Sequence, residues 1–225
     1  MIIDGGPRQN MNTAAMVAAF AEGVYEGGGE AKVVRLYDID YKGCRSCMKC
    51  KLKGQRVTCC QFPDGLTEIL RECAEANGLV LASPIYYGEI TGMMRAFWER
   101  LTFPWLNYSK GILIAPKKTS VAFIYTMNGS PAYGKKIRHS SMHKVELITS
   151  MALSHEIGQE LEVLIANNTM QVNDYSHYNF ADGTAKCKQE WRNKHWKEDL
   201  RKAQEAGKRM ALNEISSNSS CSKSN

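Results

Sequence analysis

The fold is decided at the start of the chain, where residues 1–13 read MIIDGGPRQNMNT. Met1–Ile3 is a short apolar run that favours a strand, and Gly5–Pro7 is typical of a tight turn. Asn12 or Thr13 is a suitable N-cap for a following helix. Beyond these residues, apolar side chains recur at helical spacing, at Met16, Val17, Phe20 and Val24. The stretch therefore predicts a strand, a turn and a helix in immediate succession.

The turn predicts a phosphate-binding site. It lacks the Gly-Lys-Ser/Thr ending of a Walker loop and the G-x-G-x-x-G of a dinucleotide fold. However, the backbone N–H groups at a helix start and the helix dipole both attract anions. Arg8 would add charge-assisted hydrogen bonds.

Strand-like and helix-like segments alternate along the rest of the chain. This order is typical of an α/β protein with an open, doubly wound five-stranded parallel sheet and helices on both faces. The further strands are expected at residues 31–37, 79–82, 120–126 and 161–166, and the further helices at residues 66–73, 94–101, 138–157 and 186–212.

Length and composition indicate one folded domain. The chain has 225 residues, 44% hydrophobic and 23% charged, and a net charge of 29 − 23 = +6. We expect a domain at residues 1–212, with a cysteine-rich loop at 40–63 inserted after the second strand. A disordered polar tail is expected at 213–225. The basic residues between 186 and 210 are interspersed with acids, so we interpret them as the solvated face of a helix and expect no nucleic-acid partner.

The sequence also predicts a cytoplasmic protein. No apolar run reaches the ~18 residues of a membrane span, so no membrane association is expected. The first residues lack a basic segment followed by an apolar stretch, which argues against a secretory signal.

Two more loops should lie beside the phosphate turn, because the carboxyl ends of parallel strands share one sheet edge. Residues 83–88 read SPIYYG and follow the third predicted strand, and residues 126–130 read TMNGS and follow the fourth. Two tyrosines supply flat surfaces for a planar ring. One loop for phosphate and two for a flat heterocycle predict a mononucleotide site.

At these residues the chain resembles the flavodoxin-fold, NAD(P)H-dependent FMN reductases, including their iron–sulfur flavoprotein branch. GGPRQNMNT is similar to the family's phosphate loop, SPIYYG to its flavin-ring loop, and TGMMRAFWERL at 91–101 to the helix that follows. The sequence departs from the family at Gly6, where Ser is frequent, and at Met11, where Gly is frequent.

The resemblance implies a flavodoxin-like sheet, bound FMN, and a homodimer or higher homo-oligomer whose partner subunit helps to wall the flavin. Carried over residue by residue, it places the phosphate on Arg8, Asn12 and Thr13. It places the flavin ring on one side by Pro84, Ile85, Tyr86, Tyr87 and Gly88, and on the other by Thr126, Met127, Asn128 and Gly129.

The resemblance further implies an enzyme that passes hydride from NAD(P)H to FMN and on to a small oxidant such as a quinone, a nitro or azo compound, or a flavin. The flavin carries this chemistry, so no catalytic side chain is assigned. Two alternatives remain: an iron–sulfur flavoprotein that takes electrons from ferredoxin, and a flavodoxin-type electron carrier without turnover.

The cysteine loop leaves three interpretations open. Cys44, Cys47 and Cys50 have C-x2-C-x2-C spacing, and Cys59 and Cys60 follow. Three thiolates plus one fit iron–sulfur ligation, and the family's iron–sulfur branch implies a 4Fe–4S cluster on Cys44, Cys47, Cys50 and Cys59. Four thiolates also fit zinc. The third interpretation is free thiols.

Overall fold

The computed structural model describes residues 1–53, 58–154 and 161–221, and the side chains of all of these except 214–221. Its core is a parallel sheet in the order β2-β1-β3-β7-β8. These strands span Val33–Arg35, Ile2–Asp4, Gly78–Tyr86, Ser120–Thr126 and Glu162–Ala166. After β1 the chain adds β2 on one side of it, and then returns to add β3, β7 and β8 in turn on the other side. The direction in which strands are added therefore reverses between β1 and β3, as the doubly wound order predicts.

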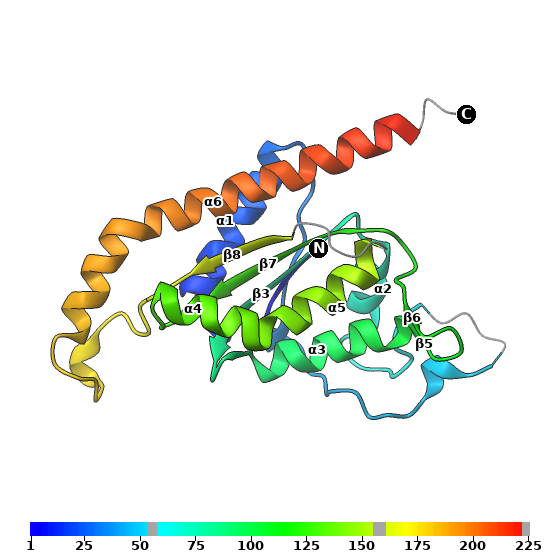
Figure 1. The fold of residues 1–225 in the computed structure, drawn as a ribbon, viewed down its shortest axis with the longest axis horizontal. Helices are drawn as coiled ribbons and strands as arrows, with labels where there is room; N and C mark the ends of the chain where they lie inside the picture. Colours follow the sequence, from blue (N-terminus) through cyan, green and yellow to red (C-terminus); the bar gives the residue numbers. More distant parts are fainter. Residues whose placement is uncertain (54–57, 155–160, 222–225) are drawn as a thin grey trace.

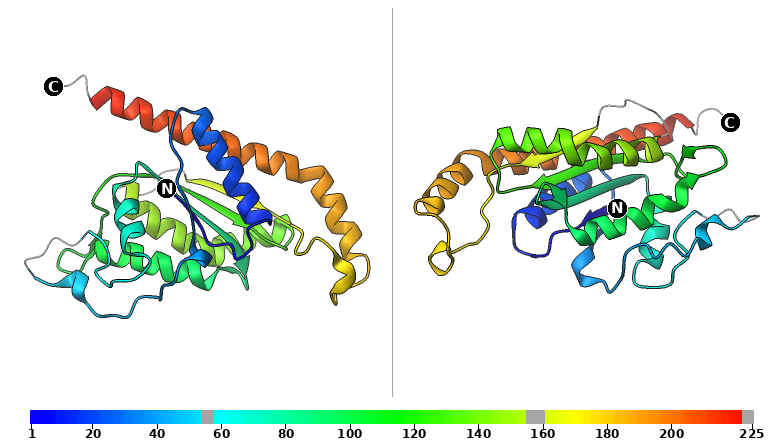
Figure 2. Two further views of the ribbon diagram at one scale, coloured as in Figure 1. Left: turned by 180° about the vertical axis from the view of Figure 1, so that it is seen from behind. Right: turned by 60° about the horizontal axis from the view of Figure 1, so that its bottom comes forward.

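Helices cover both faces of the sheet (Figure 1). α1 (Asn12–Glu26) and α6 (Thr184–Cys221) lie on one face. α3 (Gly92–Thr102) and α5 (His143–Ser154) lie on the other, and α2 (Thr67–Glu75) packs beside α3. Figure 2 shows the same layers from behind and from below. The flavodoxin-like architecture expected from the sequence is therefore confirmed.

Successive side chains of each strand point to opposite faces of the sheet, so the strands contribute to two hydrophobic cores, one on each face. Ile2, Val80 and Ile124 face α1 and α6, whereas Ile3, Leu81 and Phe123 face α3 and α5. All six side chains are buried, as expected for strands covered on both faces. Register fixes this arrangement, because Ile2 pairs with Val80 and Val80 pairs with Ala122.

Small elements interrupt the main pattern. β4 (Glu89–Ile90) pairs antiparallel with the end of β3, and β5 (Leu106–Asn107) and β6 (Ile112–Leu113) form a separate hairpin. α4 (Pro131–Ile137) continues through a π-helical turn (Arg138–Met142) into α5. Short 3-10 turns lie at Leu36–Asp38, Lys49–Lys51, Phe103–Trp105 and Tyr175–His177.

Several boundaries differ from the sequence predictions. The N-cap of α1 is Met11, so Asn12 and Thr13 are the first helical residues and not its caps. The helix predicted at 138–157 begins at Pro131, because Ser130 caps Tyr133 and proline suits a first helical position. Residues 155–157 of that prediction lie outside the described residues.

The last helix is longer than predicted and includes part of the expected tail. α6 continues to Cys221 instead of ending near residue 212. No proline or glycine occurs between 213 and 221 to break the helix, so the tail expected at 213–225 overlaps the end of α6. Residues 222–225 lie outside the described part. Within it, no helix is both long and apolar enough to cross a membrane.

Candidate mononucleotide site

The loops that follow β1, β3 and β7 meet at one cavity of about 270 Å³. It opens at the β1–β3 reversal, where ligands of this sheet topology bind. Nine of the twelve residues predicted to hold a cofactor line it: Arg8, Asn12, Thr13, Pro84, Ile85, Tyr86, Thr126, Met127 and Asn128. Tyr87, Gly88 and Gly129 belong to the same loops but do not line the cavity.

The start of α1 forms the polar end of the cavity. No side chain caps the first turn of this helix, and the turn carries no acidic residue. The Thr13 hydroxyl lies 2.8 Å from the Thr126 hydroxyl. This end therefore offers an uncapped helix start, a guanidinium, an amide and two hydroxyls, which is a donor set suited to phosphate.

Gly6 allows the loop to pass close to α1. A Cβ at this position would lie 2.9 Å from an Asp4 carboxylate oxygen and 3.1 Å from Thr13 Cβ. The Gly6 N–H donates to that Asp4 oxygen at 2.7 Å. Burial raises the pKa of Asp4, while this N–H and Arg35 partly offset the effect. The departure from the family's frequent Ser thus has a steric reason here.

The ring side of the cavity is held by backbone geometry. β3 runs to Tyr86 and turns back into β4 through Tyr87 and Gly88, which have φ of 53° and 86°. The Ser83 hydroxyl accepts the Thr91 N–H at 3.0 Å, and the Thr91 hydroxyl donates to the Gly5 carbonyl at 2.9 Å. The second loop is thereby fixed to the first. Tyr86 and Tyr87 are both exposed beside the opening.

A segment after β8 also reaches the cavity, at a position that the sequence alone could not fix. Thr169, Met170 and Gln171 line the cavity wall. The Asn12 amide donates to the Met170 carbonyl at 2.6 Å, and the Arg8 guanidinium donates to the Gln171 carbonyl. Hydrogen-bond donors predicted to bind phosphate thus hold backbone carbonyls of this segment.

Lys188 of α6 also contributes to the site, although the sequence did not indicate it. Its side chain is 6% exposed, and its ammonium donates to the Asn128 carbonyl at 2.9 Å and the Asn168 side chain at 2.5 Å. Burial lowers the pKa of this lysine. It joins the loops after β7 and β8, and the only signal in the sequence was its place in the basic run.

The cysteine loop does not form a metal site in this structure. Cys44, Cys47, Cys50 and Cys60 line one small cavity of about 20 Å³, whereas Cys59 is buried in the hydrophobic core. Among the described residues, no group of three or more His, Cys, Asp or Glu side chains is arranged to hold a metal ion.

The chemistry of this loop points the same way. Burial raises the pKa of the Cys50 thiol, which opposes the thiolate form that metals bind. The predicted ligand set of Cys44, Cys47, Cys50 and Cys59 is therefore not brought together in this structure. The predicted fourth ligand, Cys59, lies apart because its side chain packs with the core under α2.

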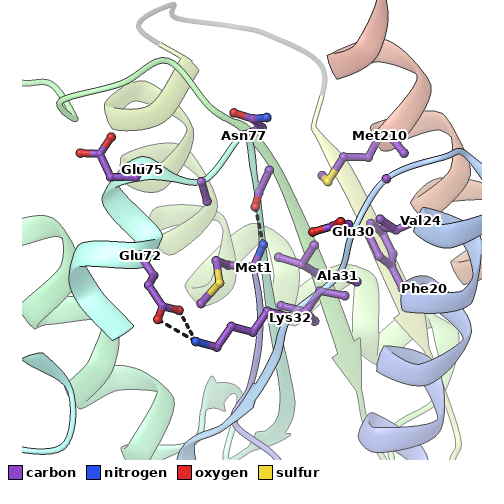
Figure 3. Close-up of a pocket in the computed structure, with 16 residues that line it drawn as sticks. Met1, Phe20, Val24, Glu30, Ala31, Lys32, Glu72, Glu75, Asn77 and Met210 are labelled. Carbon is purple, nitrogen blue, oxygen red and sulfur yellow. Dashed lines mark hydrogen bonds and ion pairs between the residues drawn. The ribbon is translucent and has the colours of Figure 1, made fainter. Parts of the chain in front are cut away.

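A larger cavity of about 680 Å³ lies at the opposite edge of the sheet (Figure 3). Apolar side chains such as Phe20, Val24 and Met210 line it, and Lys32 pairs with Glu72 at its rim. The single lysine that lines it is already paired with Glu72, and the cavity lies at the amino ends of the strands. We therefore assign the functional site to the smaller, polar cavity.

The fold and this cavity define a flavodoxin-like mononucleotide-binding protein. Comparison with known proteins specifies the family. The family model described as NADPH-dependent FMN reductase matches residues 1–155, so the chain belongs to that family.

The curated relatives it matches are iron–sulfur flavoproteins. One, from Methanocaldococcus jannaschii, is 32% identical over 98 residues, which are 44% of this chain and 49% of the relative. Another, from Archaeoglobus fulgidus, is 32% identical over 100 residues, covering 44% and 47% respectively. The chain thus matches about half the length of these relatives.

Solved structures share the fold over nearly the whole chain. An NAD(P)H:quinone oxidoreductase from Methanothermobacter marburgensis has a TM-score of 0.63 at 17% identity, covering 92% of this chain and 95% of that one. An FMN-dependent NADH-azoreductase from Bacillus anthracis, solved in complex with FMN, has a TM-score of 0.61 at 16% identity, covering 93% and 98%. At this identity the likeness concerns the fold alone.

Proposed function

We propose that this protein is an FMN-dependent oxidoreductase that takes hydride from NAD(P)H and reduces a small oxidant such as a quinone, a nitro or azo compound, or a flavin. One observation carries the proposal. The phosphate-type donors of the first loop and the two ring-side loops line a single cavity at the β1–β3 reversal. Family membership supports the same conclusion.

The residues fit FMN by their chemistry. Arg8, Asn12, Thr13 and the first turn of α1 would hold the phosphate. The 84–88 and 126–129 loops would hold the ring from either side. When bound, FMN supplies the two-electron chemistry that links a nicotinamide to an acceptor.

The protein's own contribution is position and electrostatic field. Thr13 and Thr126 fix the helix start against β7, and Thr91 fixes the phosphate loop to the ring loop. Backbone N–H groups of the Tyr86–Gly88 turn would stabilise negative charge at the edge of the ring. We assign no side chain as an acid, base or nucleophile.

Phosphate binding requires a local exchange of partners. Arg8 and Asn12 now donate to the Gln171 and Met170 carbonyls. A phosphate would take over these donors, because charge-assisted hydrogen bonds are stronger than those to neutral carbonyls. The 169–171 segment would then move away from the start of α1.

We also propose a cytoplasmic homodimer. The described cysteines from Cys44 to Cys187 are free thiols, which suits a reducing compartment. Tyr86 and Tyr87 are exposed beside the cavity, where a second subunit would complete the wall around the ring.

The test is the spectrum and turnover of the purified protein. After saturation with FMN and removal of the excess, we expect retained flavin absorbance and steady oxidation of NADPH or NADH with a quinone. Flavin retention without turnover would favour a flavodoxin-type carrier. A colourless protein would contradict the proposal.

A second candidate is an iron–sulfur flavoprotein, as the curated relatives are named. Its support in this chain is the shared cavity of Cys44, Cys47, Cys50 and Cys60. Iron and sulfide assays after anaerobic purification test it. Cys60→Ser should remove iron, and Cys73→Ser, a buried cysteine of the α2 core, should retain it. Absence of iron from the wild type would reject this candidate.

A further inference from the structure

The last helix carries a second cation, one turn beyond Lys188, to the start of α1. Arg192 of α6 lies with Nη1 3.5 Å from the side-chain oxygen of Asn12. Asn12 is the first residue of α1 and lines the cavity. The Arg192 guanidinium also lies over the Trp196 ring, 4.6 Å from its centroid. This stacking holds the long side chain in one direction.

The charge around the polar end of the cavity is unbalanced. Among the described residues, no carboxylate forms an ion pair with Arg8, Lys188 or Arg192. The first turn of α1 contains no acid. Asp4, under the same loop, lies 3.6 Å from Arg35 and accepts the Gly6 N–H. Arg8 in the cavity wall and Arg192 beside Asn12 are therefore two cations near the start of α1 that have no carboxylate partner among the described residues.

Arg8 and Arg192 reach Asn12's end of the cavity from different parts of the chain. Arg8 belongs to the loop after β1, and Arg192 comes from α6, which lies across α1 (Figure 1). Two guanidinium groups that converge on a helix start form a strong site for a phosphate dianion. Arginine suits this role because its planar fork matches phosphate oxygens.

We propose that Arg192 is a second guanidinium ligand of the mononucleotide phosphate, so that α6 closes the phosphate end of the site. This inference rests on the proposed function, because it takes FMN as the mononucleotide. It also gives one member of the 186–210 basic run a specific role, although the sequence indicated only a solvated face.

The test compares the binding of FMN with that of riboflavin, which has the same ring but no phosphate. The comparison isolates the contribution of the phosphate to affinity. Dissociation constants of both are measured by flavin fluorescence for the wild type, Arg192→Ala, Arg192→Lys and Lys194→Ala. Lys194 is an exposed cation of the same helix and serves as the matched control. Thermal unfolding of each variant checks that it is folded.

We expect Arg192→Ala to weaken FMN binding by about tenfold or more, the size of one charge-assisted contact, and to leave riboflavin binding unchanged. Arg192→Lys should recover part of the loss, and Lys194→Ala should change neither constant. Equal FMN affinity in Arg192→Ala and wild type would overturn the inference. An equal loss for both flavins would also overturn it, because that pattern indicates a structural role. A wild type that binds neither flavin would instead overturn the proposed function.

Discussion

At the scale of single residues, Tyr87 has a backbone conformation that a tyrosine rarely adopts. Its φ is 53°, and its side chain is fully exposed beside the candidate site. Such strain persists only where the surroundings impose it, and it concentrates at functional sites. Here the β3–β4 turn imposes it, with Gly88 at φ 86° completing the reversal. The motif SPIYYG indicated a tight return but not which residue would be strained.

Glu146 is a buried acid of α5, on the sheet face that α3 and α5 cover. It lies 3.1 Å from the Arg138 guanidinium and 4.0 Å from the His143 ring. The buried Tyr125 hydroxyl, near the same carboxylate, has no hydrogen-bond partner among the described residues. Burial raises the pKa of Glu146, and Arg138 partly offsets this.

This shift predicts a pH dependence of stability. With its pKa raised in the folded state, Glu146 holds its proton more tightly there than in the unfolded chain. The folded state therefore loses stability as pH rises above the ordinary glutamate pKa of about 4.3. We expect the unfolding free energy of wild type to fall relative to Glu146→Gln over this range, measured by urea denaturation at a series of pH values.

The control for this titration is Glu99→Gln, which changes an exposed glutamate on α3. Its stability should run parallel to wild type across the same pH range. Parallel curves for wild type and Glu146→Gln would contradict the assignment of the shift to Glu146.

At the scale of elements, glycines set the crossing of α1 and α6. A Cβ on Gly23 of α1 would lie 1.8 Å from the Gln204 carbonyl oxygen, and one on Gly207 of α6 would lie 2.1 Å from the Phe20 carbonyl oxygen. The two backbones are therefore in direct contact. This contact fixes α6, and with it Lys188 and Arg192, relative to the start of α1.

Gly23→Ala should accordingly destabilise the fold. Alanine is the better helix former by about 1 kcal/mol, but overpacking of backbone against backbone costs more. We expect a net loss of about 2 kcal/mol or more in unfolding free energy, measured by urea denaturation. Gly92→Ala is the matched control, because nothing lies within 4 Å of a Cβ at this helical glycine. A Gly23→Ala variant as stable as Gly92→Ala would show that the helices do not cross this closely.

Element types followed from local patterns more reliably than their ends did. The run SVAFIYT predicted β7 at 120–126 as observed, because a strand covered on both faces is continuously apolar. The start of α4 was missed because its first turn, Pro131–Gly134, carries no apolar periodicity. The β5–β6 hairpin was also missed, since each of its strands has only two residues.

At the scale of the whole molecule, the sheet topology followed from the alternation of strands and helices. That topology brings the loops that follow the first, third and fourth predicted strands to one edge of the sheet. Most of the residues predicted to hold the cofactor therefore line one cavity. The contributions of Met170, Gln171 and Arg192 depend on how distant segments return across α1, and no local pattern encodes that. The position of Cys59 likewise depends on packing, since Cys59 packs in the core whereas Cys60, the next residue, lines the cysteine cavity.

The central claim is that FMN occupies the cavity at the β1–β3 reversal. A crystal structure of the protein with FMN tests this most directly, because cavities lie at both the carboxyl and the amino ends of the strands. We predict the phosphate at the first turn of α1, within hydrogen-bond distance of Arg8, with the ring between the 84–88 and 126–129 loops. FMN bound in the cavity lined by Phe20, Val24 and Met210 would contradict the account.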